Sequence, residues 1–289
     1  MIKKMFLTVM AIGAFTFSCN DDETVGPTTA DLVLNLLGLE DLGNDFVYEG
    51  WIIVDGSPVS TGTFSSVVFP QTFSVDATQL ANATTFVLSI EPTVDPDPAP
   101  ADTKILVGDF TGDSANVNAN IVGDFSNAAG AFFLRTPTDE TGVDNGNNEN
   151  GVWFGTPGMP PTSNFVLPTL PDGWVYEGWV VGDAGPISTG TFTMFDTVDS
   201  TNFFSGTENN AGPPVPGEDF FLNAPVGETF PLDVRNRTVV ISVEPSPDNA
   251  VAPFAIKPLV GTAGTETAPD THAFAANLGS LPSGTITRN

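Results

Sequence analysis

The residues of this chain best suited to chemistry are glutamates that occur in matching pairs. Glu49 and Glu177 lie inside short apolar runs, and Glu91 and Glu244 each stand directly before a proline. Paired carboxylates could act as acid and base on a glycosidic bond. They could also bind a hard cation such as calcium. The four glutamates are therefore candidate ligand or ion contacts.

A lysine follows each proline-flanked glutamate at the same spacing, Lys104 after Glu91 and Lys257 after Glu244. This repetition favours a structural interpretation over a catalytic one. Each glutamate would form a partly buried pair with its lysine, or accept hydrogen bonds from loop amides. On this interpretation we expect no catalytic residue, no metal site and no cofactor.

These glutamates belong to a sequence that occurs twice. Residues 46–64 read FVYEGWIIVDGSPVSTGTF, and residues 174–192 read WVYEGWVVGDAGPISTGTF. In both copies, short β-branched runs alternate with Gly, Pro, Asn and Asp, which is typical of strands and turns. We therefore expect an all-β fold with two tandem β-sandwich domains, immunoglobulin-like or related. Their predicted ranges are residues 31–155 and 165–289.

Two segments outside the repeated blocks also matter for this organisation. Each copy ends in a similar short segment, which we call its closing segment: GAFFLR at 130–135 and GTITR at 284–288. The second copy is longer between its repeated blocks, and the additional sequence includes GTENNAGPPVPGED at 206–219. Its Gly, Pro and Asn content predicts an exposed excursion.

Aromatic residues recur with the glutamates, as Tyr48 and Trp51 in the first copy and Tyr176 and Trp179 in the second. They could line a platform for a carbohydrate. Aromatic residues in strands more commonly pack in a core, where they bury a large apolar area. We therefore expect all four side chains to be core residues.

Composition excludes several classes of function. The chain has 35 Asp and Glu but 8 Lys and Arg, so its surface repels phosphate backbones and we expect no nucleic-acid partner. His272 is the only histidine, which excludes a metal site built from several histidines. The run DETGVDNGNNEN at 139–150 is rich in oxygen ligands but lacks the EF-hand spacing. We expect it to be a solvated turn.

The N-terminal residues predict where the protein is located. Residues 1–18 have a basic start and a short apolar run, and Cys19, the only cysteine, follows directly. This arrangement resembles a bacterial lipoprotein signal, as found in Bacteroidota. The resemblance implies that residues 1–18 are removed, that Cys19 is lipidated and that residues 19–30 form an acidic tether. We expect an outer-membrane lipoprotein that faces the periplasm or the cell surface.

Three features recur in both copies: the YEGW block, the STGTF return, and the Glu-Pro strand end with its later Lys and Leu-Val-Gly. Together they resemble the extracytoplasmic domain of anti-sigma-K factors of the RskA type. The resemblance implies a β-sandwich fold and a sensing role. Because the lipid anchor at Cys19 precedes both copies, we expect no sequestration of a sigma factor. We expect a non-enzymatic envelope binding or sensing module with an envelope protein partner. The alternatives are a structural or adhesive surface protein and, third, a carboxylate-based hydrolase.

Overall fold

The computed structural model describes residues 28–141, 146–208, 212–247 and 250–289. Of the described residues, 42% are in strands and 6% in helices, which confirms the all-β prediction. The helices are α1 (Ala77–Asn82) and the short 3-10 helices η1 (Ala119–Ile121), η2 (Asn148–Asn150) and η3 (Leu278–Ser280). No helix in the described ranges has the length and apolarity needed to cross a bilayer. The predicted signal and Cys19 lie outside these ranges.

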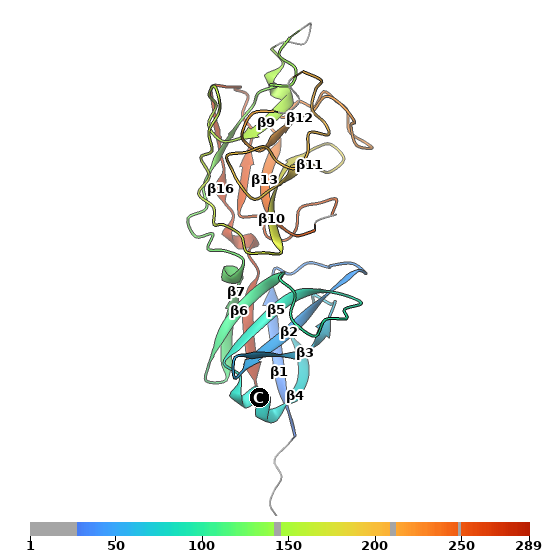
Figure 1. The fold of residues 1–289 in the computed structure, drawn as a ribbon, viewed down its shortest axis with the longest axis vertical. Helices are drawn as coiled ribbons and strands as arrows, with labels where there is room; N and C mark the ends of the chain where they lie inside the picture. The colour runs from blue at the N-terminus through green and yellow to red at the C-terminus, as the bar shows by residue number, and fades with distance from the viewer. Residues whose placement is uncertain (1–27, 142–145, 209–211, 248–249) are drawn as a thin grey trace, which may run out of the picture.

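The first lobe, the lower one in Figure 1, is one eight-stranded antiparallel sheet with the order β3-β2-β5-β6-β7-β17-β1-β4. The sheet curls around its own core, because the ring of Phe64 near one edge lies 5.8 Å from that of Phe73 near the other. Its strands are β1 (Thr29–Leu37), β2 (Phe46–Val54), β3 (Ser57–Phe64), β4 (Gln71–Asp76), β5 (Thr85–Pro92), β6 (Lys104–Thr111), β7 (Ser114–Asn118) and β17 (Ser283–Arg288).

The second lobe contains two smaller sheets, with the orders β11-β10-β13-β14-β16 and β12-β9-β8-β15. The two sheets continue into one another where the chain passes from β15 to β16. The strands are β8 (Ala131–Phe133), β9 (Gly151–Phe154), β10 (Trp174–Val181), β11 (Pro186–Phe192), β12 (Gly217–Asp219), β13 (Thr238–Pro245), β14 (Leu259–Thr262), β15 (His272–Ala273) and β16 (Ala275–Ala276).

Both copies of the repeated block form a hairpin with the same irregularity. The β2–β3 register shifts after Gly50, and the β10–β11 register shifts after Gly178. Opposite each shift stands a glycine with positive φ, Gly62 at 112° and Gly190 at 114°. An L side chain rarely adopts that backbone conformation, so glycine is required at this β-bulge.

The two copies exchange their closing strands. The closing segment of the second copy forms β17, which lies between β7 and β1 in the first lobe, with Ile286 opposite Ala115. The closing segment of the first copy forms β8, which lies between β15 and β9 in the second lobe, with Phe132 opposite His272. Each copy is therefore completed by a strand from the other.

Side-chain size distinguishes the two closing strands. The ring of Phe132 lies 4.9 Å from that of Phe274, and a Cβ on Gly261 would come within 2.9 Å of Phe132. Gly261 of β14 thus leaves space for this ring, but the first lobe has the equivalent glycine, Gly108 of β6, so the difference between the lobes lies in the closing side chain at the position of Phe132. In the first lobe the equivalent position holds the smaller Ile286, which is fully buried.

This exchange changes the predicted division of the chain. The boundary expected between residues 155 and 165 does not separate the sheets, because residues 131–154 pair in the second lobe and residues 283–288 in the first. Sequence similarity defines two copies, but strand pairing assigns the closing segments to the opposite lobes. The second lobe is in effect inserted between β7 and β17.

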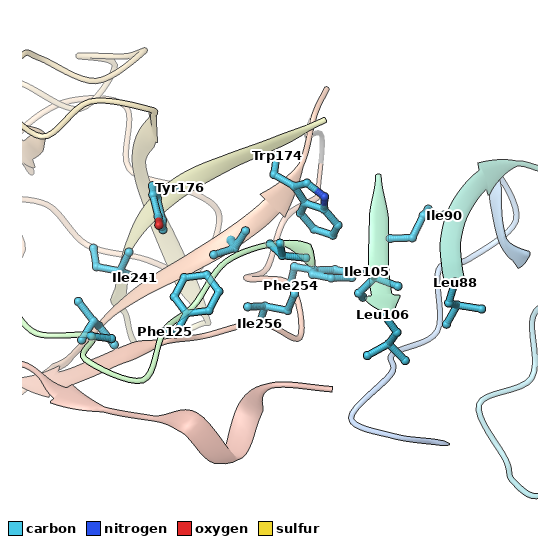
Figure 2. Packing of buried hydrophobic residues seen from close by; sticks show 14 of the residues in the cluster. Leu88, Ile90, Ile105, Leu106, Phe125, Trp174, Tyr176, Ile241, Phe254 and Ile256 are labelled. Atoms are coloured by element: carbon cyan, nitrogen blue, oxygen red, sulfur yellow. The ribbon is translucent and has the colours of Figure 1, made fainter. Parts of the chain in front are cut away.

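The lobes also share an apolar core. Buried residues of both lobes form one continuous cluster. Figure 2 shows Trp174 and Phe254 of the second lobe beside Ile90 and Ile105 of the first. Gly173 packs so closely on the first lobe that a Cβ there would lie 2.9 Å from the backbone of Asp102. The two lobes are therefore packed against each other as well as joined by the chain.

The exchange can be tested with engineered disulfides in a Cys19→Ala background. Asn116 lies directly opposite Thr285, and Ala131 occupies the position in β8 that Thr285 has in β17. We expect Asn116→Cys with Thr285→Cys to form a disulfide, because paired strands bring the Cβ atoms within bonding range. Asn116→Cys with Ala131→Cys is the matched control and should stay reduced. Mass spectrometry showing a cross-link only in the control would mean that each copy closes itself.

Candidate binding cleft between the lobes

The glutamates before the prolines belong to a buried hydrogen-bond chain that is the same in both lobes. In the first lobe Trp51 Nε1 donates to Ser89 Oγ at 2.8 Å, and the Ser89 hydroxyl donates to the Glu91 carboxylate. The second lobe repeats this chain, with a Trp–Ser distance of 2.8 Å, through Trp179, Ser242 and Glu244. We call each of these a Trp–Ser–Glu relay.

Each relay ends on the loop that follows the Glu-Pro strand end. Glu91 accepts a hydrogen bond from the Ala101 amide at 2.8 Å, and Lys104 Nζ donates to the Ala101 carbonyl at 2.8 Å. Glutamate and lysine thus hold the same loop residue, which is the loop-amide alternative of the sequence prediction. The second lobe has the same contacts through Glu244, Phe254 and Lys257, with an amide distance of 2.9 Å.

The other two predicted glutamates also have matching contacts. Glu49 accepts a hydrogen bond from the Ser60 hydroxyl, and Glu177 accepts one from Ser188. Each serine oxygen in turn accepts a backbone amide of its β-bulge, at 3.2 Å from Gly62 in the first lobe. These glutamates therefore stabilise the hairpin bulges. Glu49 also lies opposite Ser89, the middle residue of the relay, and its negative charge adds to the burial that raises the pKa of Glu91.

The strand ends that the relays support meet at a cleft of about 480 Å³ between the lobes. Its walls contain the proline of each Glu-Pro strand end and both relay-bound loop residues, so the relay glutamates Glu91 and Glu244 are next in the chain to lining residues. The first lobe contributes Glu40, Asp41, Leu42, Phe46, Ile90, Pro92, Ala101, Asp102 and Thr103, and the second contributes Gly173, Pro245, Ser246, Pro247, Ala250 and Phe254.

Tyr48 of the repeated block positions another part of the cleft wall. Its hydroxyl donates to the Glu40 carbonyl at 2.9 Å, and Tyr176 makes the equivalent bond to Pro168 at 2.6 Å. Burial raises the pKa of the Glu40 carboxyl, and the nearby Lys257 and the Ala255 amide lower it only in part. Glu40 is thus a partly desolvated carboxyl at the surface of the cleft.

The remaining sequence candidates are structural where the structure describes them. Tyr48, Trp51, Tyr176 and Trp179 are buried, as predicted for core residues. His272 Nδ1 accepts the Gly264 amide at 3.1 Å, and its Nε2 lies 2.9 Å from the Glu266 carbonyl. Of the predicted turn at 139–150, residues 142–145 lie outside the described part of the chain.

Sequence reasoning missed a group of buried carboxyls in the second lobe. Glu218 and Asp219 of β12 are fully buried, although they belong to the segment 206–219 that was predicted to be exposed. Asp219 accepts hydrogen bonds from Thr138, at 2.6 Å from its hydroxyl, and from Trp153 Nε1 at 2.8 Å. It thereby fixes the part of the first copy that crosses into the second lobe. No local sequence signal distinguishes these two acids from the solvated ones.

Burial changes the ionisation of these carboxyls. It raises the pKa of Glu218 from 4.5 to about 8, with Asp199 and Asp219 adding to the shift, and the Ser205 hydroxyl opposing it. It raises the pKa of Asp199 and of Asp219 from 3.8 to about 7. Within the described ranges no three His, Cys, Asp or Glu side chains are grouped to hold a metal ion.

Comparison with known proteins finds no family model that matches this chain, and no similar curated protein or solved structure. The resemblance to anti-sigma-K factors therefore stays a prediction from the repeated residues. The cleft geometry is the basis for the functional argument.

The buried carboxyls predict how stability depends on pH. From about pH 4.5 to pH 8 the folded chain keeps a proton on Glu218 that the unfolded chain releases, so the free energy of unfolding falls as pH rises. We expect Glu218→Gln, which cannot ionise, to reduce the fall in Tm between pH 5 and pH 8 by about 5 °C. The exposed Asp270→Asn is the control. If calorimetry shows the same dependence of Tm on pH in Glu218→Gln as in the wild type, the raised pKa assigned to Glu218 is contradicted.

Proposed function

We propose that this protein is a non-enzymatic, lipid-anchored envelope binding module whose ligand occupies the cleft between the lobes. The observation that carries the proposal is that both walls of the cleft are stabilised in the same way, because the same Trp–Ser–Glu relay holds a cleft-lining loop in each lobe. Apolar clefts with a few polar groups are the usual form of small-molecule sites. A rigid wall lowers the ordering cost of binding.

The position of the chain ends is compatible with an anchored module. Thr29 at the start of β1 pairs with Asp76, and the Asp31 amide donates to the Asn289 carbonyl at 3.3 Å. Both ends of the described chain thus lie at the end of the first lobe that is remote from the second (Figure 1). An anchor at Cys19 would leave the cleft and the second lobe directed away from the membrane.

Binding can be tested with the full chain and the neutral apolar fluorophore N-phenyl-1-naphthylamine. We expect saturable binding, weakened about tenfold by Phe46→Ala, because that side chain lines the cleft. Glu91→Ala should also weaken binding, since Ser89 and Ala101 lose their acceptor at a cost of about 1–3 kcal/mol. Glu91→Gln is the matched control, because its amide oxygen can accept both bonds. Absence of binding, or equal binding by all variants, would contradict the proposal.

A structural or adhesive role is the second candidate, and the strand exchange favours it. Two chain crossings and a shared core join the lobes, and the lobes are stacked along the long axis of the molecule (Figure 1). A force between the anchor and the second lobe would be carried by both crossings, at β7–β8 and β16–β17. Two lobes joined in this way form an elongated unit that is suited to projecting from a cell surface.

Location distinguishes an adhesive role from a periplasmic one. We expect the wild-type chain in the membrane fraction and the Cys19→Ala chain in the soluble fraction, because one lipidated cysteine is the proposed anchor. Protease is then added to intact cells, and the protein is followed by blotting. Degradation supports the adhesive role, and protection until the envelope is permeabilised excludes it. Equal membrane association of both chains would contradict the anchor.

A further inference from the structure

The described lining of the cleft has one sign of charge. Its ionisable side chains are Glu40, Asp41 and Asp102, and none of the described lining residues is Lys, Arg or His. All three carboxyls belong to the first lobe. Glu40 is half-buried, whereas Asp41 and Asp102 are exposed. Carboxylates around one concave surface still attract a cation more strongly than the same groups scattered over an open surface.

The opposite wall is apolar. Phe254 of the second lobe is 4% exposed, and Pro245 and Pro247 lie beside it along the cleft. Figure 2 shows the Phe254 ring below Trp174 and directed toward the first lobe. Leu42, Phe46 and Ile90 continue this apolar surface on the first lobe. A ligand that filled the cleft would therefore need a substantial apolar part.

Of the three carboxyls in the cleft lining, Glu40 would be stabilised most by a bound cation. It is half-buried, and burial opposes its charged form more than Lys257 and the Ala255 amide favour it. Lys257 Nζ is already engaged with the Phe254 carbonyl on the loop. A second positive charge in the cleft would recover part of the solvation that the carboxylate has lost.

We infer that the cleft selects an apolar ligand that carries a positive charge, such as an alkyl or aryl amine. The cationic group lies at the Glu40 and Asp102 wall, and the apolar part lies against Phe46 and Phe254. This inference rests on the proposed function of the cleft and adds the class of ligand to it. The overall negative charge of the chain, −27, favours the approach of the same class.

The test uses three eight-carbon compounds that differ in charge: octylamine, octanol and octanoate. Each is titrated into the full chain loaded with N-phenyl-1-naphthylamine, and displacement is measured by fluorescence at neutral pH, where the amine is protonated. We expect octylamine to bind about tenfold more tightly than octanol, and octanoate to bind least. Glu40→Gln and Asp102→Asn should each weaken octylamine several-fold and octanol much less, because the neutral hydroxyl gains no attraction between opposite charges. Asp31→Asn, which removes an equal charge on β1 outside the cleft, should change neither.

The outcomes separate this inference from the proposed function. Equal displacement by octylamine and octanol, with the fluorophore still bound in the cleft, would overturn the charge preference and leave an apolar binding site. Tighter octylamine binding that Asp31→Asn weakens as much as Glu40→Gln would also overturn it, because general charge would then explain the preference. Failure of the fluorophore to bind would remove the site itself.

Discussion

The reciprocal exchange of closing strands is the constraint on which the rest of the structure depends. Domains in tandem usually move relative to one another, because one linker and a small interface join them. Here β8 completes the second lobe and β17 completes the first, so neither lobe is complete without a strand from the other copy. Separation of the lobes would require the loss of whole strands as well as of the shared apolar core. The space between the lobes is consequently a cleft of fixed geometry, which a flexible pair of domains would not provide.

Within that frame the repeated block stabilises its own hairpin bulge in each lobe and also holds neighbouring loops. Tyr48 binds the Glu40 segment, and the relay from Trp51 through Ser89 to Glu91 binds Ala101. A buried polar network is costly when it is incomplete, but it fixes one conformation when its groups are paired. The recurring residues of the two relays therefore hold loop residues of the cleft walls, although the relay residues are not themselves part of the cleft lining.

Local sequence pattern was sufficient for the strands, the hairpins and the Glu-Pro loops, because each depends on residues close together in the chain. It also gave loop amides as one of two alternative partners for Glu91 and Glu244, the other being Lys104 and Lys257. It was insufficient for the exchange, because GAFFLR and GTITR have similar strand patterns and their partners are chosen by packing against distant residues such as Phe274. The buried pair Glu218 and Asp219 was missed for a related reason, since only tertiary contacts distinguish these acids from the many solvated ones. The cleft itself forms between copies, where no local pattern applies.

Duplication followed by divergence explains how two similar lobes can form an asymmetric site. The relays place Ala101 and Phe254 at equivalent positions, one residue before Asp102 and Ala255, and the two tyrosine bonds make Glu40 equivalent to Pro168. At each of these positions the first lobe has the smaller or acidic residue and the second has the apolar one. Of these second-lobe residues only Phe254 lines the cleft, so the acidic side chains belong to one wall. Identical walls would favour a symmetric ligand, whereas these walls distinguish the two ends of an elongated one. The framework residues that hold the loops have stayed the same while the residues at the surface have changed, which is the pattern expected of a scaffold that carries a binding site.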